Sequence, residues 1–264
     1  MTVRDPSPAR DRVNVLGCEI DRLDRGQTLA ACAAAIEERR FTQHMAINAA
    51  KIVALTKDSD LQRIVEGCEL VSADGQAVVW ASRLLGDRLP ERVAGIDLMQ
   101  ALLELAEARG YRVYILGAQP AVLERAVAVI RRRHPALVLA GHRDGYFPDE
   151  QADAVAADIA VSRPDILFVA MSSPRKEYFL GEFGRRVGAS LVMGVGGSVD
   201  VLAGVTRRAP ALMQRAGLEW LFRLAQEPRR MLRRYAVTNM RFLWMLARAR
   251  AHVRRPLCRA VTRG

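Results

Sequence analysis

The sequence predicts an α/β fold, in which a Rossmann-like, mostly parallel sheet carries helices on both faces and is followed by a helical basic appendage. Three observations support this prediction. At least five segments have the pattern of a strand followed by a helix, and such alternation is typical of a parallel sheet covered on both sides. Of the 264 residues, 50% are hydrophobic, which is enough for a globular core. Positive charge is concentrated near the C-terminal end.

This uneven charge divides the chain into two predicted parts. Residues 205–264 contain 15 arginines, no lysine and two acidic residues, a net charge of +13. The whole chain carries +11, so residues 1–204 together carry −2. We therefore expect a Rossmann-like domain over 1–204 and an Arg-rich helical appendage over 205–264. A basic appendage can bind nucleic acid, an anionic membrane or a phosphorylated ligand.

Other features of the composition argue against several classes of protein. The four cysteines are far apart and form no CxxC pair, which favours a reducing cytoplasmic setting. The four histidines are scattered, so we expect no metal site. The sequence has no run of 18 apolar residues and no signal-peptide core. It also lacks a dinucleotide-binding glycine fingerprint, a P-loop and a nucleophile elbow.

The spacing of apolar residues predicts the elements in order. In the first half of the chain we expect strands over 13–20, over 44–48 and ending at Val71, and helices over 27–40, 49–55, 59–67, 76–85 and 98–109. In the second half we expect strands over 111–117, 136–141, 164–171 and from 191, and helices over 120–133, 150–161 and from 172. The pattern is again helical after Ala209, with one helix over 217–226 and another from Pro228, because proline is favoured in a first helical turn.

Asp74 and Gly75 follow a strand and precede a helix, which places them at the predicted carboxyl edge of the sheet. Ligands bind at this edge in open α/β sheets, and glycine lets the backbone approach a ligand closely. Asp74 can equally cap the next helix, because aspartate is a favoured N-cap residue. Asn48, at the end of the strand over 44–48, has the same two interpretations.

The polar loop over 86–97 contains Arg92, Gly95 and Asp97 just before a helix. An arginine in this position suits a phosphate, because its paired hydrogen bonds add to the partial positive charge of the helix end. The alternative is a solvated loop in which Asp97 is the N-cap.

The helix from Pro228 has apolar residues at three- and four-residue steps, among them Met240, Leu243 and Leu246. Arginines recur every seven residues along it, at Arg234, Arg241, Arg248 and Arg255. A basic amphipathic helix that also carries Phe242 and Trp244 is typical of one that lies on an anionic membrane surface. The alternative is a helix packed on its own domain or on a partner. We expect no nucleic-acid partner, because aromatic residues are few and no recognition motif is present.

Seven segments resemble the WecG/TagA/CpsF glycosyltransferase family (glycosyltransferase family 26), in order and with matching spacing over residues 13–245. They are INAAKIV (47–53), SADGQAVVWASRLLG (72–86), RVAGIDLM (92–99), GHRDGYF (141–147), PDILFVAMSSPRKE (164–177), GVGGSVDVLAG (194–204) and RRAPALMQRAGLEWLFRLAQEPRRMLRRY (207–235).

The resemblance implies an inverting, metal-independent and cofactor-free transfer of a sugar from a UDP-sugar to a polyprenyl-diphosphate-linked sugar during cell-surface polysaccharide assembly. It implies a peripheral protein at the inner face of the cell membrane, with a catalytic domain over 1–204 and an appendage that closes the active site and contacts the membrane. It places the catalytic base at Asp74, contacts to the nucleotide base at Tyr146 and Asp200, and diphosphate contacts in the appendage arginines. The complete set of candidate substrate-binding residues is Asn48, Gly75, Arg92, Gly95, Asp97, Gly117, Tyr146, Lys176, Glu177, Gly196, Gly197, Asp200, Arg223, Arg230 and Arg233.

Two departures from the family pattern leave the transferred sugar open. Lys176 stands where the family usually has glutamine, and it can select a donor with a carboxylate, contact a phosphate or simply be tolerated. Ala46 stands where a hydroxyl residue is common. The sequence also leaves open whether the chain forms a homo-oligomer. Two alternative functions stay open. One is a non-catalytic scaffold that binds a UDP-sugar or a lipid carrier, and the other, less favoured by the sequence, is a Rossmann-type oxidoreductase.

Overall fold

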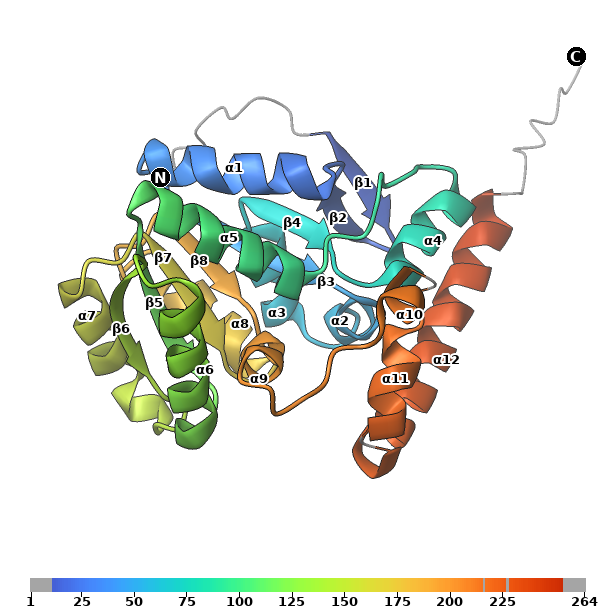
Figure 1. The fold of residues 1–264 in the computed structure, drawn as a ribbon. Helices are drawn as coiled ribbons and strands as arrows, with labels where there is room; N and C mark the ends of the chain where they lie inside the picture. Colours follow the sequence, from blue (N-terminus) through green and yellow to red (C-terminus); the bar gives the residue numbers. More distant parts are fainter. Residues whose placement is uncertain (1–10, 216, 227, 254–264) are drawn as a thin grey trace, which may run out of the picture.

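The computed structural model describes residues 11–215, 217–226 and 228–253 (Figure 1). Its centre is a six-stranded sheet in the order β4-β3-β8-β7-β5-β6, and every neighbouring pair of strands is parallel. The strands are β3 (Thr42–Ile47), β4 (Leu70–Ala73), β5 (Arg112–Gly117), β6 (Val138–Arg143), β7 (Ile166–Ala170) and β8 (Leu191–Gly194). The predicted α/β class, with a parallel sheet between helices, is confirmed.

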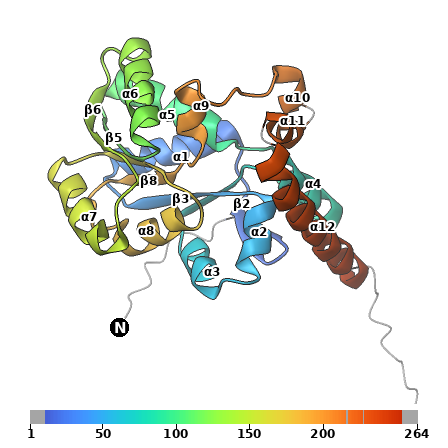
Figure 2. The same cartoon turned by 90° about the horizontal axis from the view of Figure 1, so that it is seen from below.

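Helices cover both faces of this sheet (Figure 2). Ile115 and Phe168 point to one face and Leu116 and Val169 to the other, because side chains alternate along a strand. The first face is covered by α1 (Arg25–Glu37), α5 (Gly95–Arg109), α6 (Pro120–Arg133) and α9 (Ser198–Leu202). The second is covered by α2 (Ala49–Leu55), α3 (Ser59–Glu66), α7 (Ala152–Val161) and α8 (Arg175–Phe183).

The chain leaves the neighbouring strands β3 and β8 toward opposite faces of the sheet, into α2 and α9. In open α/β sheets, a ligand crevice is expected where the connections diverge in this way. Asn48 follows β3, Asp74 follows the adjacent β4, and residues 195–197 follow β8. Three of the segments predicted to bind substrate therefore meet at this switch point.

Several predicted elements have other bounds in the structure; the helix expected over 27–40 ends at Glu37, and the strand expected over 136–141 runs from Val138 to Arg143. The single strand expected over 13–20 is a hairpin of β1 (Arg12–Val15) and β2 (Cys18–Asp21), because Leu16 and Gly17 have positive φ angles of 54° and 87° and reverse the chain. Helix α5 begins at Gly95 rather than at residue 98. Asp97 therefore lies in its first turn, and the interpretation of Asp97 as the N-cap is wrong.

In the part of the chain that the structure describes, α9 is followed by α10 (Ala211–Arg215), α11 (Glu219–Gln226) and α12 (Pro228–Val253). Helix α12 packs against α2 and against α4 (Gln76–Leu85) (Figure 1). None of the described helices combines the length and the apolar character needed to cross a bilayer.

The apolar side chains of α12 point in two directions. Phe242 and Leu246 are buried in the core formed with β1, β2, α2 and α4. Met240, Leu243 and Trp244 are exposed instead. The structure thus differs from the prediction, which placed Phe242 with the membrane-facing residues and Met240 and Leu243 in the apolar row with Leu246.

Candidate active site

Asp74 lies at the carboxyl edge of the sheet, directly after β4. Its own N–H donates to the Ile47 carbonyl at 2.8 Å, and its Oδ1 accepts a hydrogen bond from Gly95 N at 3.0 Å. Gly95 is the first residue of α5, so this bond satisfies one of the unpaired N–H groups of that helix. The N-cap of α4 is Gly75, which provides no side-chain cap. The interpretation of Asp74 as the cap of the following helix is therefore wrong.

Asn48 caps α2, because its Oδ1 accepts from Lys51 N at 3.0 Å. It also borders the Asp74 segment. A Cβ at position 75 would lie 3.2 Å from the Asn48 Cβ, so glycine lets the two strand ends approach each other. Gly95 lies beside Ala46, because a Cβ at position 95 would be 4.0 Å from the Ala46 Cβ. The sheet edge thus brings together residues from β3, β4 and the start of α5.

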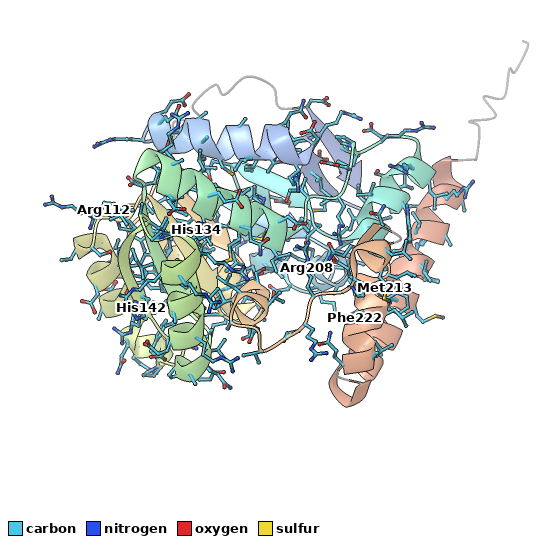
Figure 3. The ribbon with its side chains drawn as sticks, viewed as in Figure 1. Arg112, His134, His142, Arg208, Met213 and Phe222 are labelled. Carbon is cyan, nitrogen blue, oxygen red and sulfur yellow. The ribbon has the colours of Figure 1, made fainter. Side chains whose placement is uncertain are left out.

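Arg92 and Asp97 flank Gly95, and each forms an ion pair with a residue of the predicted appendage. Arg92 Nη1 lies 2.6 Å from Glu219 Oε2 and Nη2 lies 3.3 Å from Oε1, a bidentate contact. Arg208 Nη2 lies 2.6 Å from Asp97 Oδ1. Figure 3 labels Arg208, together with Met213 and Phe222 of α10 and α11. Burial lowers the pKa of Arg92, but the carboxylates of Glu219, Asp74 and Asp97 outweigh it and raise that pKa.

A buried charge cluster lies between α2 and α8. Glu177 is 1% exposed, and its Oε1 accepts from Lys51 Nζ at 2.7 Å and Lys176 Nζ at 2.8 Å. Ser173 Oγ donates to its other carboxylate oxygen at 2.9 Å. Burial raises the pKa of Glu177, but the two ammonium groups outweigh this effect and lower the pKa to about 2. Glu177 therefore remains ionised and holds Lys176 in position.

The glycines at the strand ends allow close packing of the loops. Gly117 has a φ angle of +119°, and a Cβ there would lie 2.6 Å from the Ala170 carbonyl carbon. A Cβ at Gly196, whose φ angle is +49°, would lie 4.0 Å from Lys176 Nζ. Gly197 precedes α9, and its Cβ would lie 3.6 Å from Asp200 Oδ2. The loop after β8 thus lies against both Lys176 and Asp200.

Other predicted residues are less closely tied to this cluster. Tyr146 lies in the loop after β6 and its side chain is 68% exposed. Arg223 lies on α11 and Arg230 and Arg233 on α12, but the side chains of these three arginines lie outside the described residues. Within the described ranges, no three histidine, cysteine, aspartate or glutamate side chains are grouped as a metal would require. Metal independence stays a prediction.

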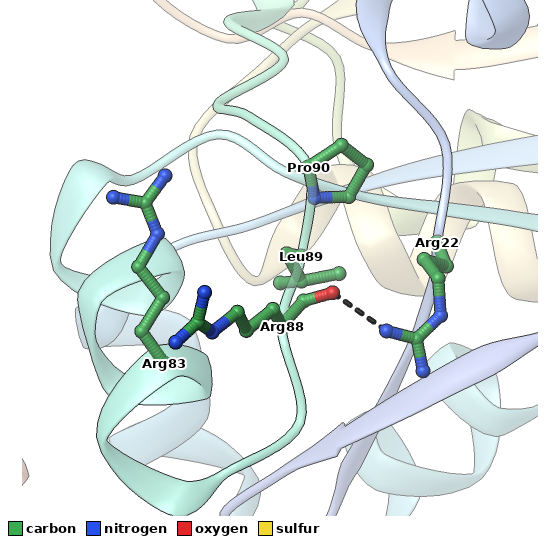
Figure 4. A pocket seen from close by; sticks show the side chains of 5 residues that line it. All are labelled: Arg22, Arg83, Arg88, Leu89 and Pro90. Atoms are coloured by element: carbon green, nitrogen blue, oxygen red, sulfur yellow. Dashed lines mark hydrogen bonds between the residues drawn. The ribbon is translucent and has the colours of Figure 1, made fainter.

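The structure also has a hollow of about 570 Å³ (Figure 4). Arg22, Arg83, Arg88, Leu89 and Pro90 line it. Within it, Arg22 is held by the Arg88 carbonyl at 2.7 Å, and it also pairs with aspartates outside the hollow. None of the predicted substrate-binding residues lines this hollow.

Sequence reasoning missed three residues that contact the candidate site, namely Lys51, Arg208 and Glu219. Lys51 interrupts the otherwise apolar helix AAKIVAL, and a lysine in such a helix needs a charged partner if it is buried. Residues 205–264 contain 15 arginines and two acidic residues, one of which is Glu219. A carboxylate in so basic a segment favours a specific cationic partner, but the sequence spacing does not identify that partner as Arg92.

A parallel α/β sheet with an aspartate and several cationic side chains at its carboxyl edge suits an enzyme of the glycosyltransferase class. The comparisons agree, because the sequence profile of the glycosyl transferase WecG/TagA/CpsF family matches residues 13–256. The chain is also 35% identical over 176 residues to N-acetylglucosaminyldiphosphoundecaprenol N-acetyl-beta-D-mannosaminyltransferase of Bacillus spizizenii (strain ATCC 23059 / NRRL B-14472 / W23). That alignment covers 67% of this chain and 68% of the relative. The chain belongs to the WecG/TagA/CpsF glycosyltransferase family.

Proposed function

We propose that this protein transfers a sugar, with inversion and without a metal, from a UDP-sugar to a polyprenyl-diphosphate-linked sugar in cell-surface polysaccharide assembly. The observation that carries the proposal is the position of Asp74, whose carboxylate is fixed by Gly95 N at the switch point of a glycosyltransferase sheet. The name of the Bacillus relative describes a lipid-diphosphate-linked acceptor, which supports an acceptor of the same chemical class here.

In this proposal Asp74 is the general base. It removes the proton from the acceptor hydroxyl while that oxygen attacks C1 of the donor sugar, on the face opposite the nucleotide. The bond between C1 and the phosphate oxygen breaks, and UDP leaves with the bonding electrons. Arginine guanidinium groups neutralise the charge that develops on UDP, through paired hydrogen bonds to phosphate oxygens. Arg92 is one such group, and Arg223, Arg230 and Arg233 are the others.

Lys176 is the residue through which the donor sugar could be selected. Its ammonium group lies beside the loop after β8 and is held there by Glu177. A carboxylate on the donor sugar and a donor phosphate are the two ligands that such an ammonium group suits. Tyr146 and Asp200 are proposed contacts of the nucleotide base, and the backbone at Gly75, Gly117, Gly196 and Gly197 allows the donor to approach.

We further propose that residues 205–264 form an appendage that holds the enzyme on an anionic membrane surface. Exposed large hydrophobic side chains are frequent on α11 and α12, where they include Trp220, Leu221, Val237, Met240, Leu243 and Trp244. The guanidinium group of Arg248 lies 5.4 Å above the Trp244 ring. Basic and aromatic side chains on one helix suit the interface of an anionic leaflet, where each basic residue contributes about 1 kcal/mol.

The test is a transfer assay with the full chain, anionic vesicles and a synthetic polyprenyl-diphosphate-linked N-acetylglucosamine, offered a panel of UDP-sugars. Transfer of one sugar with inverted configuration, in the presence of EDTA, is the expected result. A protein that binds UDP with a thermal shift but transfers no sugar from any donor would support the scaffold function instead.

A further inference from the structure

Arg92 is paired with a carboxylate of the protein, whereas the proposed function requires it to bind the donor diphosphate. Its guanidinium group is bound by both carboxylate oxygens of Glu219, at 2.6 and 3.3 Å. The pair is sheltered, because the Arg92 side chain is 14% and the Glu219 side chain 24% exposed. A guanidinium fork binds carboxylate and phosphate with the same paired geometry. One face of Arg92 therefore cannot hold Glu219 and a diphosphate at the same time.

We propose that Glu219 is a positioning residue that occupies the anion site of Arg92 in the unliganded protein and is displaced from it by the diphosphate of the donor. This inference rests on the proposed function for the identity of the ligand, but the competition itself requires only an anion that binds Arg92. Glu219 thereby sets the affinity of the site and keeps Arg92 oriented until the donor arrives.

The surrounding contacts allow Glu219 to move without unfolding its segment. Arg208 is paired with Asp97, and the side-chain amide of Gln226 binds the backbone of Arg207: its Oε1 accepts from Arg207 N at 3.2 Å and its Nε2 donates to the Arg207 carbonyl at 3.1 Å. Gly217, with a φ angle of +70°, packs so closely on Gln76 that a Cβ there would lie 2.6 Å from its Cγ. These attachments fix the backbone on both sides of Glu219, so rotation of its side chain is enough to uncover Arg92.

An internal competitor reduces apparent affinity in proportion to the fraction of molecules in which the site is open. Glu219→Gln removes the negative charge while keeping the size of the side chain, so the open fraction rises. We expect this variant to bind inorganic pyrophosphate about 3- to 10-fold more tightly than the wild type. Glu219→Asp keeps the charge and should bind with an affinity closer to that of the wild type.

The experiment is calorimetric titration of the full chain with inorganic pyrophosphate and, separately, with UDP. A control variant, Glu182→Gln, removes an exposed carboxylate on α8 and reports the effect of net charge alone. Arg92→Gln is combined with Glu219→Gln in a double-mutant cycle. The inference requires that Glu219→Gln tightens pyrophosphate binding more than Glu182→Gln does, and that this gain disappears in the Arg92→Gln background.

Equal or weaker pyrophosphate binding by Glu219→Gln would overturn the inference, as would a gain that persists without Arg92 or a wild type and variant that both fail to bind pyrophosphate. The proposed function fails separately. If Glu219→Gln gains affinity for pyrophosphate but no form binds UDP, the competition is supported and the UDP-sugar donor is refuted. If UDP binds every form and Glu219→Gln gains no affinity for pyrophosphate, the donor survives and the competition is refuted.

Discussion

Replacing Asp74 with asparagine separates a catalytic carboxylate from a structural one. The Asp74 Oδ1 accepts from Gly95 N at 3.0 Å, and an asparagine amide can present its oxygen to the same N–H. The fold and the start of α5 should therefore survive the substitution. The amide nitrogen, however, cannot accept a proton from the acceptor hydroxyl, so the proposed base is lost while its position is still filled.

The two roles predict losses of very different size. A weakened hydrogen bond to one backbone N–H costs about 1 kcal/mol, which is roughly fivefold in an equilibrium. Loss of a general base lowers the rate of the chemical step by about 10²- to 10⁴-fold. We therefore expect kcat to fall at least about 100-fold in Asp74→Asn, with UDP affinity within roughly threefold of the wild type.

The assay is single-turnover sugar transfer to the lipid-linked acceptor, alongside calorimetric UDP binding. Asp165→Asn is the matched control, because its carboxylate also accepts a backbone N–H, that of Arg112 at 2.7 Å, but at the amino end of β7. This control should lose little activity. Transfer by Asp74→Asn at more than a tenth of the wild-type rate would refute the assignment of Asp74 as the base.

Three further substitutions test charge and exposure. Lys51→Met removes one of the two ammonium partners of buried Glu177, so the free energy of unfolding in urea should fall by about 3 kcal/mol, the low end of the range for a broken buried pair because Lys176 remains. Burial and then Lys51 lower the pKa of His44 from 6.5 to about 3. Between pH 6.5 and pH 3, His44 is therefore protonated in the unfolded chain but neutral in the folded protein. The free energy of unfolding falls as the pH drops through this range, by up to about 1.4 kcal/mol per pH unit. His44→Gln should flatten that slope. Trp244→Glu should weaken co-sedimentation with anionic vesicles by about tenfold or more, whereas Val161→Glu on α7, at a side chain 83% exposed, should not.

Each of these three has an outcome that contradicts its reasoning. An unchanged free energy of unfolding in Lys51→Met would mean that the Lys51–Glu177 ion pair does not stabilise the fold. A wild type equally stable at pH 6.5 and pH 4 would mean that His44 is not held neutral. Equal loss of vesicle binding in the α7 and α12 variants would show that added negative charge, rather than the apolar face of α12, determines binding.

Local signals in the sequence predicted most of the elements, because they act over a few residues. Pro120 begins α6, Asn48 caps α2, and Gly86 ends α4 with a left-handed φ angle of 96°. The position of Asp74 was predictable in the same way, since a strand, a polar pair and a helix follow one another there. The hairpin turn at Leu16 was missed, because leucine rarely adopts the positive φ angle that the turn needs.

The partners of the site residues were beyond prediction, because they come from distant parts of the chain. Lys51 and Glu177 are 126 positions apart, and Arg92 and Glu219 are 127 apart. Apolar periodicity fixes which side of a helix is buried, but it carries no information about which charged residue meets which. The sequence therefore predicted Arg92 as a cation suited to a phosphate, which stays a prediction, and it could not reveal that Glu219 binds this arginine.

Residues 92–97 make three contacts with residues that lie far away in the sequence. Arg92 binds Glu219, Gly95 N binds the Asp74 carboxylate, and Asp97 binds Arg208. Immediately afterwards Leu98, Met99 and Leu102 are fully or almost fully buried in the core, so the first turn of α5 is anchored and cannot shift as a unit without exposing apolar surface. Exchange of Glu219 for a diphosphate at Arg92 must therefore proceed by side-chain rotation on a fixed backbone. Such an exchange would leave Gly95 N in place, so that the proposed base keeps its orientation while the charge around the donor changes.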